Sequence, residues 1–288
     1  EILFINSAST DGSKDLIDSW IARHGKEVET KLYNINAGTD TPASSKNTGI
    51  RRATSLWVAF MDCGQLFGKD WIGKQWKYIE DYKVDIVSGC CFFEGKGVID
   101  KSAIAQTYGH KRFRPVIPTT LVKKSLFKKT GFFSENRRAG YDAAWPLLLK
   151  KLKVKRGINK EVVIRYNGVN FGDSLIFIFK KSILYAAPSV GLPNYYGPYY
   201  YLLIILFFLV MVITIPFLVK WLLLAYLIFR GFVIPIKKSH GWELFKESPI
   251  YFLSIPLLGI VIDCGKLIGT FKGFYKYHIY CNLIKGQT

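Results

Sequence analysis

The stretch from Tyr199 to Val219 restricts the fold of this chain more than any other part, because its 21 residues include no charged side chain. An α-helix needs about 20 apolar residues to cross the hydrocarbon core of a bilayer. Tyrosines gather at one end of the stretch, where the boundary between lipid and water would lie, at positions 195, 196, 199, 200 and 201. We therefore expect a transmembrane helix here.

The apolar residues that follow favour a hairpin. Lys220 interrupts the run, and residues 221–236, with Arg230 among them, are short for a second span. A tight turn near residues 216–220 would return the chain to the side of the membrane on which it started.

Two further segments mix apolar and charged residues. Residues 249–271 contain Asp263 and Lys266, which favours an interfacial or bundle-packed helix over a helix exposed to lipid. Residues 174–187 predict a helix that is either amphipathic and lies on the membrane surface or is packed in the ordinary way.

The net charge of +19 calls for an anionic partner or surface. No nucleic-acid-binding motif accompanies the basic residues, so we expect no nucleic acid partner. An anionic leaflet is a better candidate, since each Lys or Arg near it contributes roughly 1 kcal/mol, and a diphosphate ligand could use a few of the same groups. The excess of positive charge favours the cytoplasmic side of an inner membrane. The five cysteines have no zinc-finger spacing and predict reduced thiols.

Residues 1–197 have the composition of a soluble α/β domain, in which apolar strands alternate with helical patterns. The order predicts a mostly parallel sheet with helices on both faces. Ligands of such sheets bind beyond the carboxyl ends of the strands, where Asn6–Ser13 and Asp62–Gln65 would converge on one crevice. We expect an α/β domain at residues 1–172 and an amphipathic connector at 173–197. A transmembrane helix or hairpin would follow at 198–236, and a basic loop with a third membrane or interfacial helix at 237–288.

Two motifs resemble family 2 glycosyltransferases with the GT-A fold. The run from Ile2 to Ser13, ILFINSASTDGS, is similar to the first nucleotide-binding loop of that family. The run from Pro42 to Asp62, PASSKNTGIRRATSLWVAFMD, resembles its next signature, a helix followed by a strand that ends in a donor-site Asp. With Asp142, the resemblance covers about residues 1–170. It implies the GT-A fold, with C-terminal membrane helices added.

The resemblance also implies a set of donor-binding residues. A nucleotide-sugar donor would contact Asn6, Ser9, Asp11, Asn47 and Asp62. The departing diphosphate builds up negative charge that must be neutralised. A divalent cation, Mg²⁺ or Mn²⁺, would do this while bound to Asp62.

The sequence departs from the family in three places. Gly64 stands where the family usually has a second Asp, so metal binding could be weak, could recruit another ligand, or could be replaced by Arg137 and Arg138. Asn6 stands where the family often has an Asp, and an amide still forms hydrogen bonds there without charge. The first strand and loop of the family would precede Glu1, so we expect the sheet to lack a central strand.

Asp142 matches the family's catalytic base, which accepts a proton from the attacking hydroxyl. This implies inverting, single-displacement transfer, although the start of a helix also favours an Asp through capping and the helix dipole. Trp145 could stack on an acceptor sugar or pack in the core, and Arg137 and Arg138 could contact phosphate or acceptor.

The function expected from these observations is transfer of a sugar to a membrane-bound, polyprenyl-linked or glycan acceptor during bacterial surface polysaccharide assembly. One alternative is a non-catalytic relative that acts as a membrane scaffold. Another is a basic membrane protein that binds anionic lipid or nucleic acid without sugar chemistry.

Overall fold

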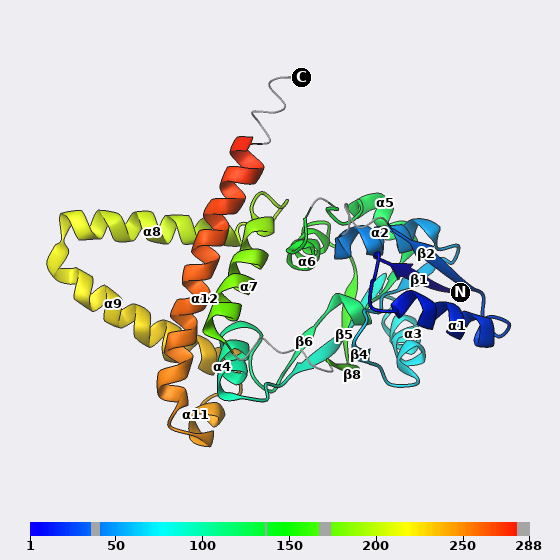
Figure 1. Cartoon of the computed structure of the whole chain (residues 1–288), viewed down its shortest axis with the longest axis horizontal. Coiled ribbons are helices and arrows are strands. Elements are labelled where there is room, and N and C mark those ends of the chain that lie inside the picture. Colours follow the sequence, from blue (N-terminus) through cyan, green and yellow to red (C-terminus); the bar gives the residue numbers. More distant parts are fainter. Residues whose placement is uncertain (36–40, 136, 167–173, 281–288) are drawn as a thin grey trace.

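The computed structural model describes residues 1–35, 41–135, 137–166 and 174–280. Within them, an α/β unit (residues 1–166) is followed by a largely helical part (residues 174–280), and Figure 1 shows the two side by side. The first two strands, β1 (Ile2–Asn6) and β2 (Thr30–Asn34), pair in parallel across helix α1 (Ser13–His24) and form a small sheet of their own.

The larger sheet has six strands among the described residues, in the order β3-β7-β5-β8-β4, with β6 paired to β5. Only β5 and β8 run parallel, whereas the other pairs of this sheet are antiparallel. The strands are β3 (Trp57–Ala59), β4 (Gln65–Leu66), β5 (Ile86–Phe93), β6 (Arg112–Pro115), β7 (Leu121–Lys123) and β8 (Arg156–Tyr166).

The expected mostly parallel sheet is therefore corrected to a mixed one. Between β5 and β6 the chain forms helix α4 (Val98–Thr107), and β6 then returns antiparallel to β5. Only a single 3₁₀ turn, η1 (Ile117–Thr119), separates β6 from β7. Strands β6 and β7 therefore follow one another along the same side of β5, and both run antiparallel to it.

Helices cover the sheet through clusters of buried apolar side chains. Helix α2 (Pro42–Arg52) begins at Thr41, whose side chain accepts a hydrogen bond from the Ser44 N–H in a reciprocal capping box. Its Ala43 and Ile50 share a core cluster with Trp145 and Leu149 of helix α6 (Tyr141–Lys151). The other elements of this unit are α3 (Trp71–Tyr82), η2 (Lys124–Leu126) and α5 (Phe127–Thr130).

The helical part contains a long hairpin and one long helix. Helix α8 (Gly197–Thr214) ends at a turn with Pro216, and helix α9 (Val219–Ile228) runs back and continues through a π-helical segment (Phe229–Val233) into α10 (Ile234–Lys238). Figure 1 shows this α8–α9 hairpin projecting away from the α/β unit, on the far side of α7 and α12. The remaining elements are α7 (Leu175–Ala186), η3 (Ala187–Ser189), η4 (Pro216–Leu218), α11 (Glu243–Glu247), α12 (Tyr251–Phe274) and a π-helical end (Tyr275–Tyr280).

Three helical segments of the described chain are long and apolar enough to cross a membrane: Gly197–Thr214, Pro216–Lys238 and Tyr251–Ile279. The first two are almost bare, with 6% and 11% of their most apolar windows buried, whereas the third has 33% buried. Bare apolar helices of this length indicate association with a membrane.

Candidate functional site

A cavity of about 870 Å³ lies where the α/β unit meets the helical part. The sheet contributes residues of β5, β6 and β8, and α6 contributes Asp142 and Trp145. Lys181 and Tyr185 of α7 complete the lining from the helical part. Asp62 also lines this cavity, so the two carboxylates singled out from the sequence face the same space.

Asp62 reaches the cavity because it follows strand β3, whose Val58 and Ala59 pair with β7. Its carboxylate forms an ion pair with Lys46 of α2, at 2.5 Å between Oδ1 and Nζ. The Lys46 side chain is 10% exposed and that of Asp62 is 35% exposed. The negative charge of Asp62 is therefore already balanced by a nearly buried ammonium group, which no local sequence pattern predicts because the two residues lie in different elements.

Asp142 is held at the first turn of α6 by the backbone that precedes it. Gly140 has φ +92, a left-handed conformation that favours glycine, and a Cβ there would lie 2.9 Å from the Ser189 Oγ. The close approach brings the start of α6 against the segment that leads into α8. Burial raises the pKa of Tyr195, and the nearby negative charge of Asp142 adds to this shift.

The cavity carries positive as well as negative groups. Arg114, Arg156 and Lys181 line it together with Asp62 and Asp142. Burial lowers the pKa of Lys181, which means that its ammonium group is partly removed from water. The mixture suits an anionic ligand that also needs a proton acceptor nearby.

Trp145 contributes to both the core and the cavity. Its ring stacks on Phe127 at a centroid distance of 5.8 Å and is 6% exposed, which gives it the packing role considered from the sequence. Its indole N–H has no hydrogen-bond acceptor among the described residues, although it is buried and the residue lines the cavity. A buried indole N–H usually finds a partner, so an acceptor supplied by a ligand would fit here.

Asn47, predicted from the sequence as a donor contact, makes structural hydrogen bonds. Its amide donates to the Phe133 carbonyl and to Glu135 Oε1, both at 2.8 Å, and its Oδ1 accepts from the Phe133 N–H at 3.0 Å. The residue is 0% exposed. With these bonds made and no exposed surface, its side chain holds residues 133–135 to α2.

The loop after β1 is ordered by its own polar groups. Asn6 is 7% exposed, donates to Asn34 Oδ1 at 2.8 Å and accepts from the Ser9 N–H at 3.2 Å. Asp11 is exposed and accepts from the Ser13 N–H at 3.1 Å, at the start of α1. Asn6, Ser9 and Asp11 do not line the cavity that holds Asp62 and Asp142.

Arg137 and Arg138 are also absent from the lining of this cavity. Arg137 donates to the carbonyls of Pro188 and Val190, and its guanidinium lies 4.0 Å from the centroid of the Tyr277 ring. It therefore ties the α/β unit to the helical part. Arg138 is exposed. The cations that the cavity does present, Arg114, Arg156 and Lys181, were not singled out as ligand contacts from the sequence.

A metal site built from protein side chains alone is not found among the described residues, which contain no group of three or more His, Cys, Asp or Glu side chains that could hold an ion. Asp62, which follows strand β3, lines the cavity. Gly64 occupies the position two residues later, where a second carboxylate was expected.

Comparisons with known proteins agree with the fold. The sequence model described as "Glycosyl transferase family 2" matches residues 1–143. An uncharacterized glycosyltransferase of Rickettsia conorii is 31% identical over 172 residues, which are 56% of this chain and 27% of that protein. Glycosyltransferase GlyA of Streptococcus pneumoniae is 24% identical over 152 residues, 52% of this chain and 20% of that protein. The chain thus spans about a quarter of the length of these curated relatives.

Among solved structures, a mannosyltransferase from Pyrobaculum calidifontis in complex with GDP-Man and Mn²⁺ resembles this chain with a TM-score of 0.52 at 15% sequence identity. The match covers 96% of this chain and 79% of that one. The likeness shows a GT-A fold, in which a mixed sheet is flanked by helices.

Proposed function

Because residues 1–143 of this chain belong to glycosyl transferase family 2, we propose that the protein transfers a sugar from a nucleotide-sugar donor to a membrane-bound acceptor. The observation that carries the proposal is the shared cavity, which brings together Asp62, Asp142 and the α7 residues Lys181 and Tyr185. The proposed donor-site residue Asp62 and the proposed proton acceptor Asp142 thus face the same cavity. Helix α7 of the helical part forms one wall of that cavity.

The donor is a nucleoside diphosphate sugar, as in the complex of the Pyrobaculum mannosyltransferase with GDP-Man. Its diphosphate gains negative charge as the bond to the sugar breaks. Arg114, Arg156 and Lys181 in the cavity wall supply positive charge, and such groups stabilise the transition state more strongly in a partly desolvated site than in water. Asn6, Ser9 and Asp11 are proposed to shape the nucleotide-binding loop after β1.

Asp142 is proposed as the catalytic base. Its carboxylate accepts the proton of the acceptor hydroxyl while the oxygen of that hydroxyl attacks the anomeric carbon. The bond from the anomeric carbon to the diphosphate breaks, and the nucleoside diphosphate leaves with the electron pair. A single displacement of this kind inverts the configuration at the anomeric carbon.

A divalent cation, when bound, would neutralise the departing diphosphate. Asp62 offers one carboxylate, and Mg²⁺ or Mn²⁺ in such sites uses one or two carboxylates, with phosphate oxygens and water as the other ligands. The residues therefore fit a cation held largely by the substrate. Lys46 competes with the cation for Asp62, because its ammonium group already contacts that carboxylate.

The acceptor is proposed to be lipid-linked, with a polyprenyl carrier, and to serve in surface polysaccharide assembly. Helix α7 supports this because one side of it lines the cavity with Lys181 and Tyr185 and another side packs on the apolar helix α12. An acceptor whose anchor lies in the bilayer would enter from this side. The excess of Lys and Arg favours the cytoplasmic face of the inner membrane for the α/β unit.

The test uses the full chain purified in detergent and supplied with nucleotide sugars, Mn²⁺ and a polyprenyl phosphate acceptor. Asp142→Asn should lower transfer by roughly 10²- to 10⁴-fold, because an amide accepts no proton, while donor binding measured by calorimetry stays unchanged. Asp81→Asn, at an exposed carboxylate of α3 paired with Lys77, is the matched control and should leave transfer intact. Full transfer by Asp142→Asn would remove the base assignment.

A non-catalytic scaffold is the second candidate, and the Lys46–Asp62 ion pair favours it, because the carboxylate is occupied in the absence of substrate. A scaffold would bind no nucleotide sugar and hydrolyse none. Binding of UDP or GDP with an increase of the melting temperature would speak against this candidate.

A further inference from the structure

Helix α12 satisfies the length and composition of a membrane span, yet one of its faces is covered over the whole length of the helix. The buried residues recur every three or four positions, as expected for one helical face. They are Tyr251, Ile255, Leu258, Gly259, Ile262, Gly265, Gly269, Thr270 and Gly273.

The first half of this face packs on α4, which belongs to the α/β unit. The hydroxyls of Ser102 and Ser254 lie 2.9 Å apart, and the Gln106 amide donates to the Ile255 carbonyl at 2.8 Å. Helix α4 also carries Lys101, which pairs with Glu247 at 2.8 Å just before α12 begins. This half of α12 is therefore in direct contact with α4, a helix with charged side chains that connects β5 and β6 of the sheet.

The second half packs on α7 and on η3, at very short range. Gly265, Gly269 and Gly273 are spaced four residues apart and thus share a face. A Cβ on Gly265 would lie 2.7 Å from the Ser182 Cβ, and one on Gly269 would lie 2.7 Å from the Ile183 carbonyl oxygen. The two helices touch through their backbones, so α7 cannot move away from α12 without breaking this packing.

These contacts decide how α12 can lie in a membrane. A crossing α12 would draw α4, α7 and the lining of the cavity into the hydrocarbon region. The charged groups of these helices include Lys101 of α4 and Lys181 of α7, and each charge near the centre of a bilayer costs several kcal/mol. An α12 that lies along the surface needs no such burial.

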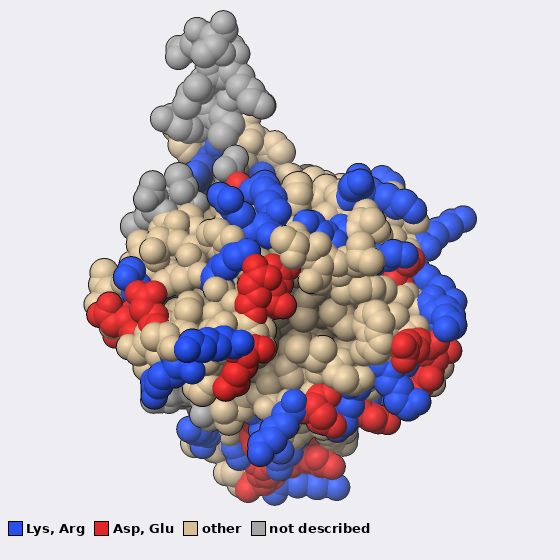
Figure 2. Space-filling model, turned by 90° about the vertical axis from the view of Figure 1, so that its right-hand side faces the viewer, with Lys and Arg blue, Asp and Glu red and all other residues tan. Residues whose placement is uncertain are grey.

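The uncovered face of α12 suits a lipid surface. It exposes large apolar side chains along its length, at Phe252, Leu253, Leu257, Ile268, Phe271 and Phe274. Lys272 and Lys276 are exposed at its end, where anionic headgroups attract them. The far face of the α/β unit has a different character, since Figure 2 shows lysines, arginines and acidic residues spread across it.

The α8–α9 hairpin points away from the α/β unit (Figure 1), as it must if α12 lies along the membrane surface and the hairpin enters the bilayer. Figure 1 shows α8 running crosswise to α12 and away from the α/β unit. Its 18 residues measure about 27 Å at 1.5 Å per residue, close to the roughly 30 Å of a hydrocarbon core. Lys220 and Trp221 stand just after the turn at the tip of the hairpin.

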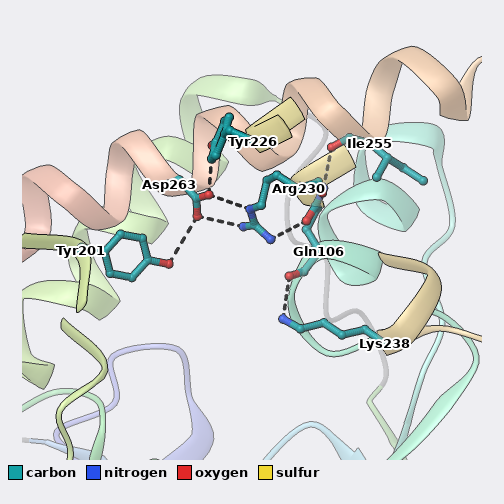
Figure 3. Close-up of polar contacts among 7 residues, drawn as sticks. All are labelled: Gln106, Tyr201, Tyr226, Arg230, Lys238, Ile255 and Asp263. Atoms are coloured by element: carbon teal, nitrogen blue, oxygen red, sulfur yellow. Dashed lines mark hydrogen bonds and ion pairs between the residues drawn. The ribbon is translucent and has the colours of Figure 1, made fainter. Parts of the chain in front are cut away.

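A polar cluster fixes the base of the hairpin to α12 and α4 (Figure 3). Arg230 donates to both carboxylate oxygens of Asp263, at 2.6 and 2.9 Å, and to Gln106 Oε1 at 2.5 Å. The hydroxyls of Tyr201 and Tyr226 donate to the same carboxylate. Asp263 is in the middle of α12, so a crossing α12 would place this cluster near the bilayer centre, whereas a surface-bound α12 keeps it at the level of the headgroups.

We propose that α12 lies in the plane of the membrane surface, with its apolar face on an anionic lipid bilayer, and that the α8–α9 hairpin alone enters the bilayer. The α/β unit and both ends of α12 are then on one side. Helix α7 separates the lipid-facing surface of α12 from the cavity. If the proposed function holds, a lipid-linked acceptor would enter the cavity from the side of α7 and α12. The membrane arrangement itself does not depend on the sugar chemistry.

The test maps lysines of the unaltered chain in sealed vesicles that contain anionic lipid. A membrane-impermeant amine reagent is added outside, and modified lysines are identified by mass spectrometry. Vesicles opened with detergent give the full reactivity of each lysine. Lys77 reports the α/β unit, with a side chain that is 76% exposed, Lys246 and Lys276 report the two ends of α12, and Lys220 reports the hairpin tip.

We expect Lys246 and Lys276 to react in the same vesicle orientation as Lys77, and Lys220 to stay unmodified in that orientation. Reaction of Lys276 only in the opposite orientation would mean that α12 crosses the bilayer. Reaction of Lys220 together with Lys77 would mean that the hairpin does not enter it. Either result overturns the proposal whether or not the protein transfers sugar, because labelling needs no activity.

Discussion

Replacing Lys46 by Met should make the protein bind Mn²⁺ more tightly in the presence of a nucleoside diphosphate. Lys46 contacts Asp62 at 2.5 Å, so a cation that uses this carboxylate must first displace the ammonium group. Hydrogen bonds to charged groups contribute about 1.5–3 kcal/mol. Since each 1.36 kcal/mol is a factor of ten, the competition amounts to roughly 10- to 100-fold in apparent affinity. The Asp62 side chain is 35% exposed, which places the expected change near the lower end.

The assay titrates Mn²⁺ into the purified chain with saturating UDP or GDP and follows free Mn²⁺ by electron paramagnetic resonance. Lys77→Met is the matched control, because Lys77 forms an exposed ion pair with Asp81 at 3.1 Å on the surface of α3 and should change nothing. Asp62→Asn should weaken the binding of the cation. If Lys46→Met leaves the dissociation constant for Mn²⁺ unchanged or larger, Asp62 and Lys46 are not in competition and the proposed cation site is elsewhere.

Three further changes test other parts of the structure. Asn47→Ala removes the bonds to residues 133–135 and should lower the free energy of unfolding in detergent by about 2–4 kcal/mol; a loss below about 1 kcal/mol would contradict its structural role. Asp263→Ala leaves the Arg230 charge buried and should cost about 3–5 kcal/mol, whereas the double replacement Arg230→Met with Asp263→Leu should cost less; equal losses would argue against coupling. Trp145→Phe keeps an aromatic ring in the core but removes the indole N–H, and it should raise KM for one substrate; unchanged kinetics would mean that no ligand accepts from the indole N–H.

Sequence patterns predicted the local elements well where a physical signal was strong. Thr41 followed by Pro42 is typical of a helix start, and the Thr41 side chain does cap α2 through the Ser44 N–H. Helix α4 carries no such signal in the sequence, because it has no single apolar face. It packs on the sheet on one side and on α12 on the other, so Ala103, Ile104 and Ala105 are all buried and the 3.6-residue pattern is lost.

The same limit applies to the candidate site. Asp62 and Asp142 were selected from motifs, and both line the cavity. Asn47 was selected in the same way, but its motif position reflects the hydrogen bonds that it makes to a segment 86 residues away. A motif records that a residue type is required at a position, without distinguishing a ligand contact from a structural bond.

The sequence by itself determined which parts of this chain prefer lipid and which prefer water, and its local motifs resemble those of family 2 glycosyltransferases, whose sequence model matches residues 1–143. These properties depend on composition and on neighbours along the chain. Tertiary structure decided the partner of Asp62, the cations of the cavity and the packing of α12. Each of these joins elements that are distant in sequence, as Arg230 and Gln106 are, and charge pairing and close packing act through space.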